Sequence, residues 1–402
     1  MTNSLPSRDL LLIGAGHTNL FAVRMWKMRP ISDVRLTLVS AFSRATYSGM
    51  LPGTLAGLYE PDSMEIDLYR FAECCGVRLI VDEAVALAPE IHRVLFTDRP
   101  PLRYDVASVG IGSVPGQREL WVGNPRVLSI KPMATFLPRF ELQLSAVLAQ
   151  CEDPADGRDA LRQNLSMPAP RGKTVRVAVI GAGAGGVEVA FGLEAWLRAR
   201  GVEALVSLAD ARPEILSGYT AGTVALAHRE LAARGISVHQ GRRVTGIVGT
   251  GIVGTGSLNI EFADGTPLPA DIIIWATAAS PPPVLANFGL PHANDGFLAV
   301  DATLKTTANF PVFAVGDSAT IVNQPLAKAG VYAVREGPIL WENLNRIFAG
   351  RELVRYEPQR GFLSLLSTGD GRAIAEYKGF SGHGRWAWKW KDHIDSKFMR
   401  MY

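Results

Sequence analysis

The feature that most constrains the fold is a glycine pattern that follows an apolar run. The segment VRVAVIGAGAGGVEVAF starts with apolar residues at 175–180 and continues with Gly181, Gly183 and Gly186 in the spacing G-x-G-x-x-G. The run predicts a buried strand, and the residues after the glycines predict a helix that extends to about residue 200. In such a unit the first glycine permits the turn, the second lets a pyrophosphate approach the backbone, and the helix N-terminus attracts the phosphate charge.

The same order of elements occurs near the beginning of the chain. Residues 10–13 form an apolar run, Gly14 and Gly16 form a shorter G-x-G turn, and a helical pattern follows. A second strand follows each unit, VRLTLVS at 34–40 and EALVSLADA at 203–211. We therefore predict an α/β fold with two Rossmann-like dinucleotide-binding domains (three-layer ββα) and a C-terminal segment. The alternative is two tight turns that bind no ligand.

The formal net charge of +3 is small for a chain of 402 residues, and it is local. Residues 385–402 contain five lysines and arginines and two aspartates, so this segment carries the whole excess. A nucleic-acid-binding protein would need a broad basic face, so the neutral remainder argues against a nucleic-acid partner. We expect one basic patch, at the C-terminal segment.

Cysteine usage and hydropathy indicate a reducing compartment and no membrane span. Cys74 and Cys75 are adjacent, Cys151 is distant, and no metal-ligand spacing occurs. No uninterrupted apolar stretch reaches the roughly 18 residues that a spanning helix needs, and no basic leader precedes the first apolar run. We predict a cytoplasmic protein without a metal site, either soluble or peripheral on the inner face of the cell membrane.

Two segments outside the glycine units have their own patterns. Residues 133–151 predict a helix, and the polar, proline-containing stretch at 152–172 predicts a surface linker. The stretch 245–257 repeats TGIVG, which predicts a β-hairpin with a glycine-rich tip.

Three further motifs carry a resemblance to a known family. They are TYSGMLPGTLAG (46–57), FPVFAVGDSATI (310–321) and AKAGVYAVREGP (327–338). With the two glycine units, they resemble the two-dinucleotide-binding-domain flavoproteins (pyridine nucleotide-disulfide oxidoreductase-like), which include type II NADH dehydrogenases. The first and third motifs are most similar to the flavoprotein domain found fused to selenide, water dikinase. The resemblance implies an FAD-binding domain of residues 1–116 and 295–345, a connecting helix and linker at 117–172, an NAD(P)H-binding domain at 173–294 and a C-terminal segment at 346–402.

The resemblance implies that the first unit binds FAD. The family's acidic residue for the adenosine ribose is replaced by Ser40, which can still bond a hydroxyl, though less strongly than a carboxylate. Asp317 would contact the ribityl–phosphate region, or alternatively cap a helix. His17 is unusual inside a phosphate turn, and its alternative is a plain surface side chain. The FAD-binding residues implied are Gly14, Gly16, Asn19, Ser40, Gly112, Asp317 and Lys328.

The second unit is expected to bind NADH at Gly181, Gly183 and Gly186. Asp210 at the strand end would accept the ribose hydroxyls and repel a 2′-phosphate, whereas Arg212 would favour NADPH by pairing with that phosphate. Glu188, one turn into the helix, lies where the family often places a residue near the nicotinamide or the acceptor. Its alternative is a carboxylate that simply favours the helix N-terminus.

The residues expected near the electron acceptor differ from those of other flavoproteins in this family. Disulfide reductases of this build need a C-x₄-C pair on the helix after the first turn, and sulfide:quinone reductases need separated cysteines beside the flavin. No cysteine pair follows the first turn, and Cys151 alone does not supply separated cysteines, since the adjacent Cys74 and Cys75 are expected to be buried or inert. Lys328 and Tyr332 stand where type II NADH dehydrogenases have quinone-side glutamines. Lys328 would stabilise the anionic reduced flavin, or alternatively lie in solvent.

These expectations combine into a function. We predict an FAD-dependent NADH dehydrogenase, non-proton-pumping, that passes electrons from NADH through FAD to a quinone-type acceptor without a redox disulfide, with Lys328 and Glu188 as its catalytic residues. One alternative is a selenium- or sulfur-linked flavin reductase. Another is a non-catalytic, redox-sensing dinucleotide-binding protein.

The last 18 residues predict an amphipathic helix. Its apolar stripe is Ala387, Trp390, Ile394, Phe398 and Met401. Trp386 and Trp388 are expected to precede the helix in a strand or turn, and basic residues lie off the stripe. This combination is typical of a helix in a membrane interface. The three candidate partners for residues 385–402 are a membrane surface, a second subunit in a homodimer, and the protein's own core.

Overall fold

The first α/β unit is built on a five-stranded parallel sheet. In this computed structural model, which describes residues 6–149, 174–249, 258–359 and 361–402, the sheet has the strand order β21-β9-β1-β2-β5. The strands are buried between two layers, so their sequences are nearly continuous apolar runs. They are β1 (Arg8–Ile13), β2 (Val34–Ser40), β5 (Arg78–Val81), β9 (Val106–Val109) and β21 (Val312–Ala314). The helices that pack with them are α1 (His17–Met28), α3 (Leu68–Cys75) and α7 (Gly330–Phe348).

The second unit repeats this plan in a later part of the chain. Its parallel sheet has the order β11-β18-β12-β13-β14. One face of the sheet packs on helices and the other on a small antiparallel sheet, which gives two separate hydrophobic cores. The strands are β11 (Val127–Ser129), β12 (Val175–Ile180), β13 (Ala204–Ala209), β14 (Ser237–His239) and β18 (Ile272–Trp275). The helices are α4 (Phe136–Ala149), α5 (Ala184–Ala199) and α6 (Ala221–Ala233).

Short sheets and one short helix complete the two units. In the second unit the third layer is β15 (Val244–Val248), β16 (Leu258–Phe262) and β17 (Pro267–Ala270). In the first unit it is β6 (Ala86–Ala88), β7 (Arg93–Leu95) and β8 (Leu102–Arg103). Other short elements are α2 (Leu51–Leu55), the antiparallel pair β3 (Arg44–Thr46) with β4 (Glu65–Asp67) and the parallel pair β20 (Leu298–Val300) with β22 (Ala319–Ile321).

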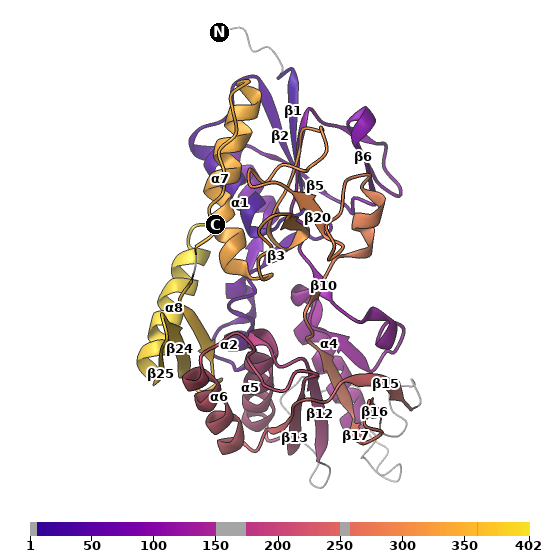
Figure 1. Ribbon diagram of the computed structural model, residues 1–402, viewed down its shortest axis with the longest axis vertical. Helices are drawn as coiled ribbons and strands as arrows, with labels where there is room; N and C mark the ends of the chain where they lie inside the picture. The colour runs from indigo at the N-terminus through magenta and orange to yellow at the C-terminus, as the bar shows by residue number, and fades with distance from the viewer. Residues whose placement is uncertain (1–5, 150–173, 250–257, 360) are drawn as a thin grey trace, which may run out of the picture.

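The predicted fold class is confirmed: the chain forms two α/β units with parallel central sheets, which lie one above the other in Figure 1. The strand at 34–40 and the helix to about residue 200 are present, as is the antiparallel pairing of β15 with β16. The 152–172 linker, the tip of that hairpin and Cys151 lie outside the described residues. The predicted domain boundaries stay a prediction.

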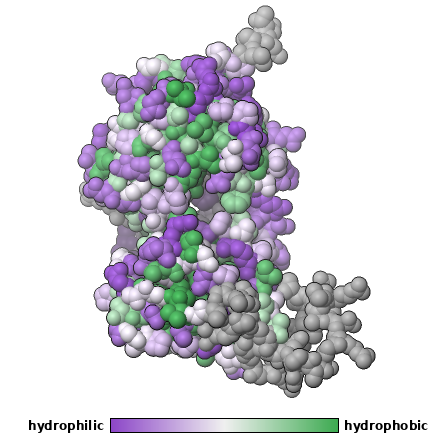
Figure 2. Space-filling model, turned by 90° about the vertical axis from the view of Figure 1, so that its right-hand side faces the viewer, coloured by the Kyte–Doolittle hydropathy of each residue, from purple (hydrophilic) through white to green (hydrophobic). Residues whose placement is uncertain are grey.

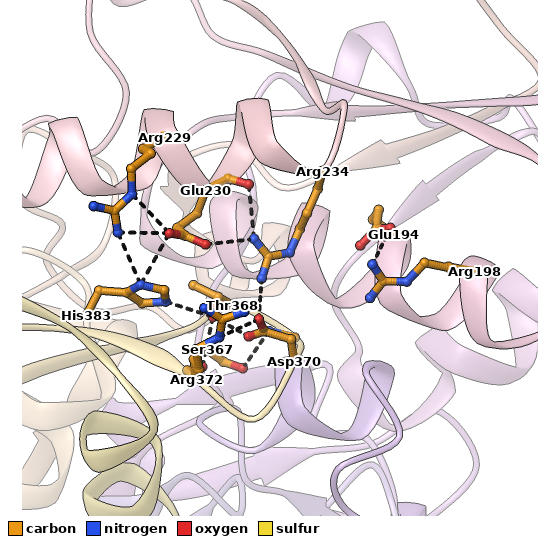
Figure 3. Close-up of polar contacts among 11 residues, drawn as sticks. Glu194, Arg198, Arg229, Glu230, Arg234, Ser367, Thr368, Asp370, Arg372 and His383 are labelled. Carbon is orange, nitrogen blue, oxygen red and sulfur yellow. Dashed lines mark hydrogen bonds and ion pairs between the residues drawn. The ribbon is translucent and has the colours of Figure 1, made fainter.

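A small C-terminal unit lies along one side of both α/β units (Figure 1). It consists of an antiparallel sheet, β23 (Ser364–Ser367), β24 (Ala373–Tyr377) and β25 (Phe380–Gly384), followed by α8 (Arg385–Met399). Figure 3 shows the polar cluster that ties it to α6. Arg234 pairs with Glu230 at 3.1 Å and with Asp370 at 2.8 Å, and His383 Nδ1 lies 3.2 Å from Glu230. These groups are largely buried, so the cluster fixes the C-terminal unit on the second unit.

The predicted apolar stripe of the last helix is partly wrong. Ala387 and Phe398 are buried as expected, but Trp390 is 46% exposed and Ile394 is 40% exposed. The inward face instead contains the buried ion pair of Lys391 and Asp395, 3.0 Å apart. Hydrophobicity alone would place these two charged side chains on the solvent-facing side of the helix, but both have partners elsewhere in the protein.

Those partners belong to the segment after β3. Lys391 Nζ donates to Gly49 O at 2.7 Å, and Tyr47 Oη donates to Asp395 at 3.0 Å. The expectation for Trp386 and Trp388 is also wrong, since both lie inside α8. The last helix therefore docks on the protein's own core with one face and leaves a tryptophan face exposed. Within the described residues, no helix is both long and apolar enough to cross a bilayer.

Candidate functional site

The carboxyl ends of the two parallel sheets meet at one crossover. β9 ends at Val109 and leads into β10 (Val114–Pro115), while β18 ends at Trp275 and leads into β19 (Ala279–Ser280). β10 and β19 pair with each other in antiparallel fashion. The sheet edges that bear the glycine turns consequently face the same region, which is the side where open α/β sheets bind ligands. Figure 2 shows the recess between the two units on one side of the molecule.

The first glycine turn lies against the end of β9. Gly14 has a φ of +90°, and a Cβ on it would lie 2.4 Å from Gly110 O. Gly16 N donates to the same carbonyl at 3.0 Å. Only glycine fits at position 14, because a side chain would meet both a strained backbone and a fixed carbonyl. The turn is therefore fixed directly against the backbone that follows β9.

Asn19 occupies the place of the third glycine and is fully buried. Its Nδ2 donates to Gly14 O at 2.9 Å, and its Oδ1 accepts from Ser108 Oγ at 2.8 Å. Both the donor and the acceptor of the Asn19 amide are thus hydrogen-bonded within the protein, so Asn19 stabilises the glycine turn. Any role that it has in cofactor binding is a positioning role.

Three helices begin beside these turns without a side-chain cap. α1 starts after Gly16, α5 after Gly183 and α7 after Ala329, and none has an acidic residue in its first turn. By contrast, Asp67 caps α3 and Thr220 caps α6. Uncapped helix N-termini present free N–H groups and a positive dipole end, which suits an anionic ligand.

The N-terminal turns of α1 and α7 are adjacent. Thr18 Oγ1 donates to Ala333 O at 2.7 Å, so the two uncapped ends lie together. With the glycine cradle of Gly14 and Gly16, this arrangement fits the pyrophosphate of a dinucleotide such as FAD.

Asp317 lies in a 3-10 turn at Gly316–Ser318 next to these helix ends. Its carboxylate accepts from Ser113 Oγ at 2.7 Å and lies 3.4 Å from Lys131 Nζ. The helix-cap alternative is wrong, since Asp317 caps no helix. The turn that contains Gly112 joins the same cluster, because Gly112 N donates to Ser318 Oγ at 2.9 Å. Sequence reasoning missed Lys131, which is distant in the chain and has no local signal.

Ser40 and His17 differ in how the structure uses them. Ser40 Oγ donates to Phe42 O at 2.8 Å, so its hydroxyl closes a local turn at the end of β2. The surface alternative for His17 is wrong. Its ring lies 5.4 Å from that of Tyr47 and 5.3 Å from that of Phe398, and its Nδ1 is buried. Burial lowers the pKa of His17 to about 4, so the ring is neutral near pH 7.

Lys328 is not in free solvent. Its Nζ donates to Thr320 Oγ1 at 2.8 Å and to Ala319 O, and it lies 4.0 Å from the centre of the Phe297 ring. Burial lowers the pKa of Lys328. The side chain lines a small cavity together with Asp317, at the start of α7. Its predicted role toward a flavin stays a prediction.

Glu336 is a buried acid that sequence reasoning passed over. Its Oε2 accepts from Gly316 N at 2.6 Å, which supports the turn that carries Asp317. Burial raises the pKa of Glu336 to about 7. A signal existed, since Glu336 lies on the same helical stripe as Ala333 and Leu340, a stripe that must face inward.

The second glycine turn is tightly packed at its first and third glycines and open at its middle one. Gly181 has a φ of +108°, and a Cβ on it would lie 2.4 Å from Ala276 O. A Cβ on Gly186 would lie 1.7 Å from Gly181 O, so helix and turn touch backbone to backbone. A Cβ on Gly183 would meet only the flexible Arg212 side chain within 4 Å, with Nη2 at 3.8 Å. The middle position is therefore open to a ligand.

Asp210 ties this turn to the end of β13. Its carboxylate accepts from Ala182 N at 2.6 Å and from Arg212 N at 2.8 Å, and Arg212 Nε lies 3.2 Å away. Burial alone would raise the pKa of Asp210, but these hydrogen bonds outweigh it and lower the pKa. The two residues expected to select between NADH and NADPH are thus paired with each other.

Glu188 points away from the glycine turn and toward the C-terminal unit. Its Oε1 accepts from Ser367 N at 2.8 Å. Burial raises the pKa of Glu188 to about 7, against the opposing charge of Lys391. The structure therefore separates Glu188 from the other predicted nucleotide-binding residues and groups it with Tyr47, Lys391 and Asp395. Sequence reasoning missed this group, although the i,i+4 spacing of Lys391 and Asp395 was a signal.

The cysteines match their expectation only in part. Cys75 is buried, and burial raises the pKa of its thiol, but Cys74 is exposed. In the part of the chain that the structure describes, no group of histidine, cysteine and acidic residues has the arrangement of a metal site.

Comparison with known proteins agrees with this geometry. A profile of the pyridine nucleotide-disulphide oxidoreductase family matches residues 139–341, half of the chain. The demethylphylloquinone reductase NdbB of Synechocystis sp. is 28% identical over 220 residues, which are 52% of this chain and 51% of NdbB. This chain thus spans about half the length of that relative.

Two solved structures have a similar fold. NDH2 of Plasmodium falciparum, solved with NADH, aligns with a TM-score of 0.77 at 14% identity and covers 98% of each chain. The sulfide:quinone oxidoreductase of Aquifex aeolicus aligns with a TM-score of 0.73 at 16% identity, over 98% of this chain and 92% of its own. At these identities the likeness shows the fold alone. On the profile match, the chain belongs to the pyridine nucleotide-disulphide oxidoreductase family, whose members are flavoproteins that bind FAD and NAD(P)H.

Proposed function

We propose that this protein is an FAD-dependent NADH oxidoreductase that passes electrons to a quinone-type acceptor without a redox disulfide. The observation that carries the proposal is the meeting of two glycine turns, each with an uncapped helix, at the β10–β19 crossover. FAD, when bound, would accept reducing equivalents from NADH and pass them to the acceptor. The protein's task is then to hold two dinucleotides in reach of each other.

The first unit supplies the FAD-binding groups. Gly14 and Gly16 let the turn at the start of α1 pack closely against Gly110 O, and the adjacent N-termini of α1 and α7 would offset the charge of the pyrophosphate. Asp317, held by Ser113 and Lys131, would accept from a hydroxyl of the ribityl chain. Lys328, half-buried just before α7, would add a positive charge beside the isoalloxazine ring.

The second unit supplies the NADH-binding groups. Gly183 is open to the pyrophosphate at the start of α5, and Asp210 would accept from the ribose hydroxyls. Arg212 neutralises part of that carboxylate, so NADPH would bind as well, but more weakly than NADH.

Two observations support a quinone-type acceptor: the missing cysteine pair and the substrates in the names of similar proteins. α1 contains no cysteine, so the pair that disulfide reductases use is missing from its expected place. The names of NdbB and of the Aquifex enzyme both refer to quinones. Within the family, we propose a relation to the flavoprotein domain found fused to selenide, water dikinase, which the motifs at 46–57 and 327–338 resemble.

The exposed face of α8 supports peripheral membrane binding. Trp386, Trp390 and Ile394 follow one another at intervals of four and are between 40% and 48% exposed. Arg385, Lys389 and Lys397 are exposed on the same helix. Interfacial tryptophans with basic neighbours favour an anionic membrane surface, where a lipid-soluble quinone would be available.

Steady-state oxidation of NADH by the FAD-loaded protein, with and without a short-chain quinone, tests the function. We expect rapid turnover that depends on the quinone. In the variant Gly183→Asp the new carboxylate would repel the pyrophosphate, and the site has room for it, so turnover should be lost while bound FAD is retained. FAD-loaded protein that reduces no quinone with NADH would reject the proposal.

A further inference from the structure

A second cavity lies outside the nucleotide turns. It has a volume of about 570 Å³ and lies between α1, α7, residues 355–359 and the end of the chain. This volume is within the range of small-molecule sites. Only His17, at the start of α1, belongs both to this cavity and to the region of the first glycine turn.

The charge in the cavity lining is mainly positive. Arg24, Arg335 and Arg355 all line it, and Glu357 is the only acidic residue of the lining. Of these three arginines, Arg24 donates from Nη1 to Met401 Sδ at 3.1 Å. Over the described ranges, none of the three arginines forms an ion pair, which leaves their charge available to an anionic group.

Three buried polar atoms of the lining have no hydrogen-bond partner within the described residues. They are His17 Nδ1, Tyr356 Oη and Gln359 Nε2. Buried polar atoms are rarely left unpaired, because each costs free energy when it loses water without gaining a partner. Their presence in one cavity indicates capacity for a polar ligand.

The remaining lining is apolar. Phe21 on α1, Ile339 on α7 and Phe398 on α8 contribute to it, and Phe398 is buried. Arg335 and Arg355 are exposed, so the charged groups lie nearer to solvent than this wall.

We propose that this cavity binds an amphipathic anion, a small molecule with an apolar body and one phosphate or carboxylate group. Arg335 and Arg355 would bind the anionic group at the mouth, and the apolar body would lie against Phe21, Ile339 and Phe398. Tyr356 would donate to the anionic group. This site is separate from the electron-transfer site and does not depend on the function proposed above.

Titration calorimetry with decyl phosphate, below its micelle concentration, tests the proposal on the full FAD-loaded chain. We expect saturable binding of one molecule per chain. The double variant Arg335→Gln/Arg355→Gln should weaken it at least about tenfold, because it removes two charge-assisted contacts. Both residues are exposed, so the fold should be unaffected. The matched control is Arg346→Gln/Arg351→Gln, which removes two arginines near the end of α7 outside the cavity and should leave binding unchanged.

Two results would overturn the proposal: the absence of saturable binding, or an equal loss of affinity in the test and control variants. Decanol, which has the same apolar body without the charge, should bind at least about tenfold more weakly than decyl phosphate. Equal affinity for the two probes would show that the arginines do not take part. The conservative variant Tyr356→Phe should weaken decyl phosphate by a few-fold, since it removes one neutral donor.

Discussion

The two α/β units contain the same glycine turn but close it differently. In the second unit, Gly186 lets the helix touch the turn backbone to backbone, since a Cβ there would lie 1.7 Å from Gly181 O. In the first unit, the buried amide of Asn19 spans the same gap and bonds Gly14 O and Ser108. The comparison teaches that a buried, hydrogen-bonded side chain can stabilise the turn where the third glycine is absent.

The ends of the second strands differ as well. Asp210 bonds the second glycine turn directly through Ala182 N. The Ser40 side chain bonds the local turn at Phe42, and the first glycine turn meets that strand through the backbone bond from Gly14 N to Val39 O. We therefore expect the second unit to discriminate between nucleotides more sharply than the first.

Gly186→Ala breaks the backbone contact and should have the largest effect. The new Cβ would overlap Gly181 O, so we expect a loss of about 3 kcal/mol in the free energy of unfolding. Guanidinium unfolding measures it. Gly185→Ala is the matched control, because nothing lies within 4 Å of its Cβ position. It should gain between zero and about 1 kcal/mol, and an equal loss in both variants would contradict the account.

Asn19→Ala tests the hydrogen bonds that stabilise the turn of the first unit. It leaves Gly14 O and the Ser108 hydroxyl buried without this partner, which should cost about 2 kcal/mol of unfolding free energy. Replacing Ser108 by Ala in the same chain removes one of the two stranded groups, so part of the loss should return. If the double variant is less stable than Asn19→Ala by the full cost of a second independent change, the two residues are not coupled.

Arg212→Gln should increase the preference of the second unit for NADH over NADPH. Removing the guanidinium leaves Asp210 less neutralised and takes away a partner for a 2′-phosphate. Relative affinity for NADPH against NADH should fall about tenfold, as expected for one charge-assisted contact. Equilibrium binding of the two nucleotides gives the ratio. The exposed Arg198, at the far end of α5, serves as the control, and an unchanged ratio in Arg212→Gln would show that it does not face the ribose.

A pH-dependent effect compares the two buried acids, Glu336 in the first unit and Glu188 in the second. Each accepts from a backbone N–H, and burial raises the pKa of each from 4.5 to about 7. The folded state then holds a proton that the unfolded state has released. Their contribution to stability is present below about pH 4.5 and is lost as the pH rises to about 7.

Replacing either acid by glutamine should flatten this decline by about 3 kcal/mol, because glutamine has no proton to release. Denaturant unfolding at a series of pH values measures the slope. A glutamine variant whose stability still falls with pH as steeply as the wild type would show that the replaced acid ionises normally.

Much of the fold could be predicted because its signals are local. Apolar runs and the glycines at 14, 16, 181, 183 and 186 fix strand, turn and helix within a few residues of chain. The site was predictable where the motif itself sets the geometry, as at Gly183. It was less predictable where the partner is distant in the chain, as for Asp317 with Lys131.

The last helix shows why the remainder could not be predicted. Hydrophobicity alone assigns Trp390 and Ile394 to its buried face and Lys391 to its polar face. The structure exposes the first two and buries Lys391, because Asp395 and Gly49 O offset its charge. The bond to Gly49 O joins residues 342 positions apart in the chain, which no periodicity reveals. Glu188 follows the same rule, since its partner Ser367 belongs to the C-terminal unit.

The central claim is that electrons cross between the two units without a protein thiol. The most direct measurement is anaerobic mixing with NADH of an FAD-loaded variant in which Cys74, Cys75 and Cys151 are all serine, followed by flavin absorbance. We predict complete loss of the oxidised flavin absorbance, as fast as in the wild type, and its return when a short-chain quinone is added. Flavin that stays bound but is not reduced by NADH in this variant, while the wild type is reduced, would contradict the account.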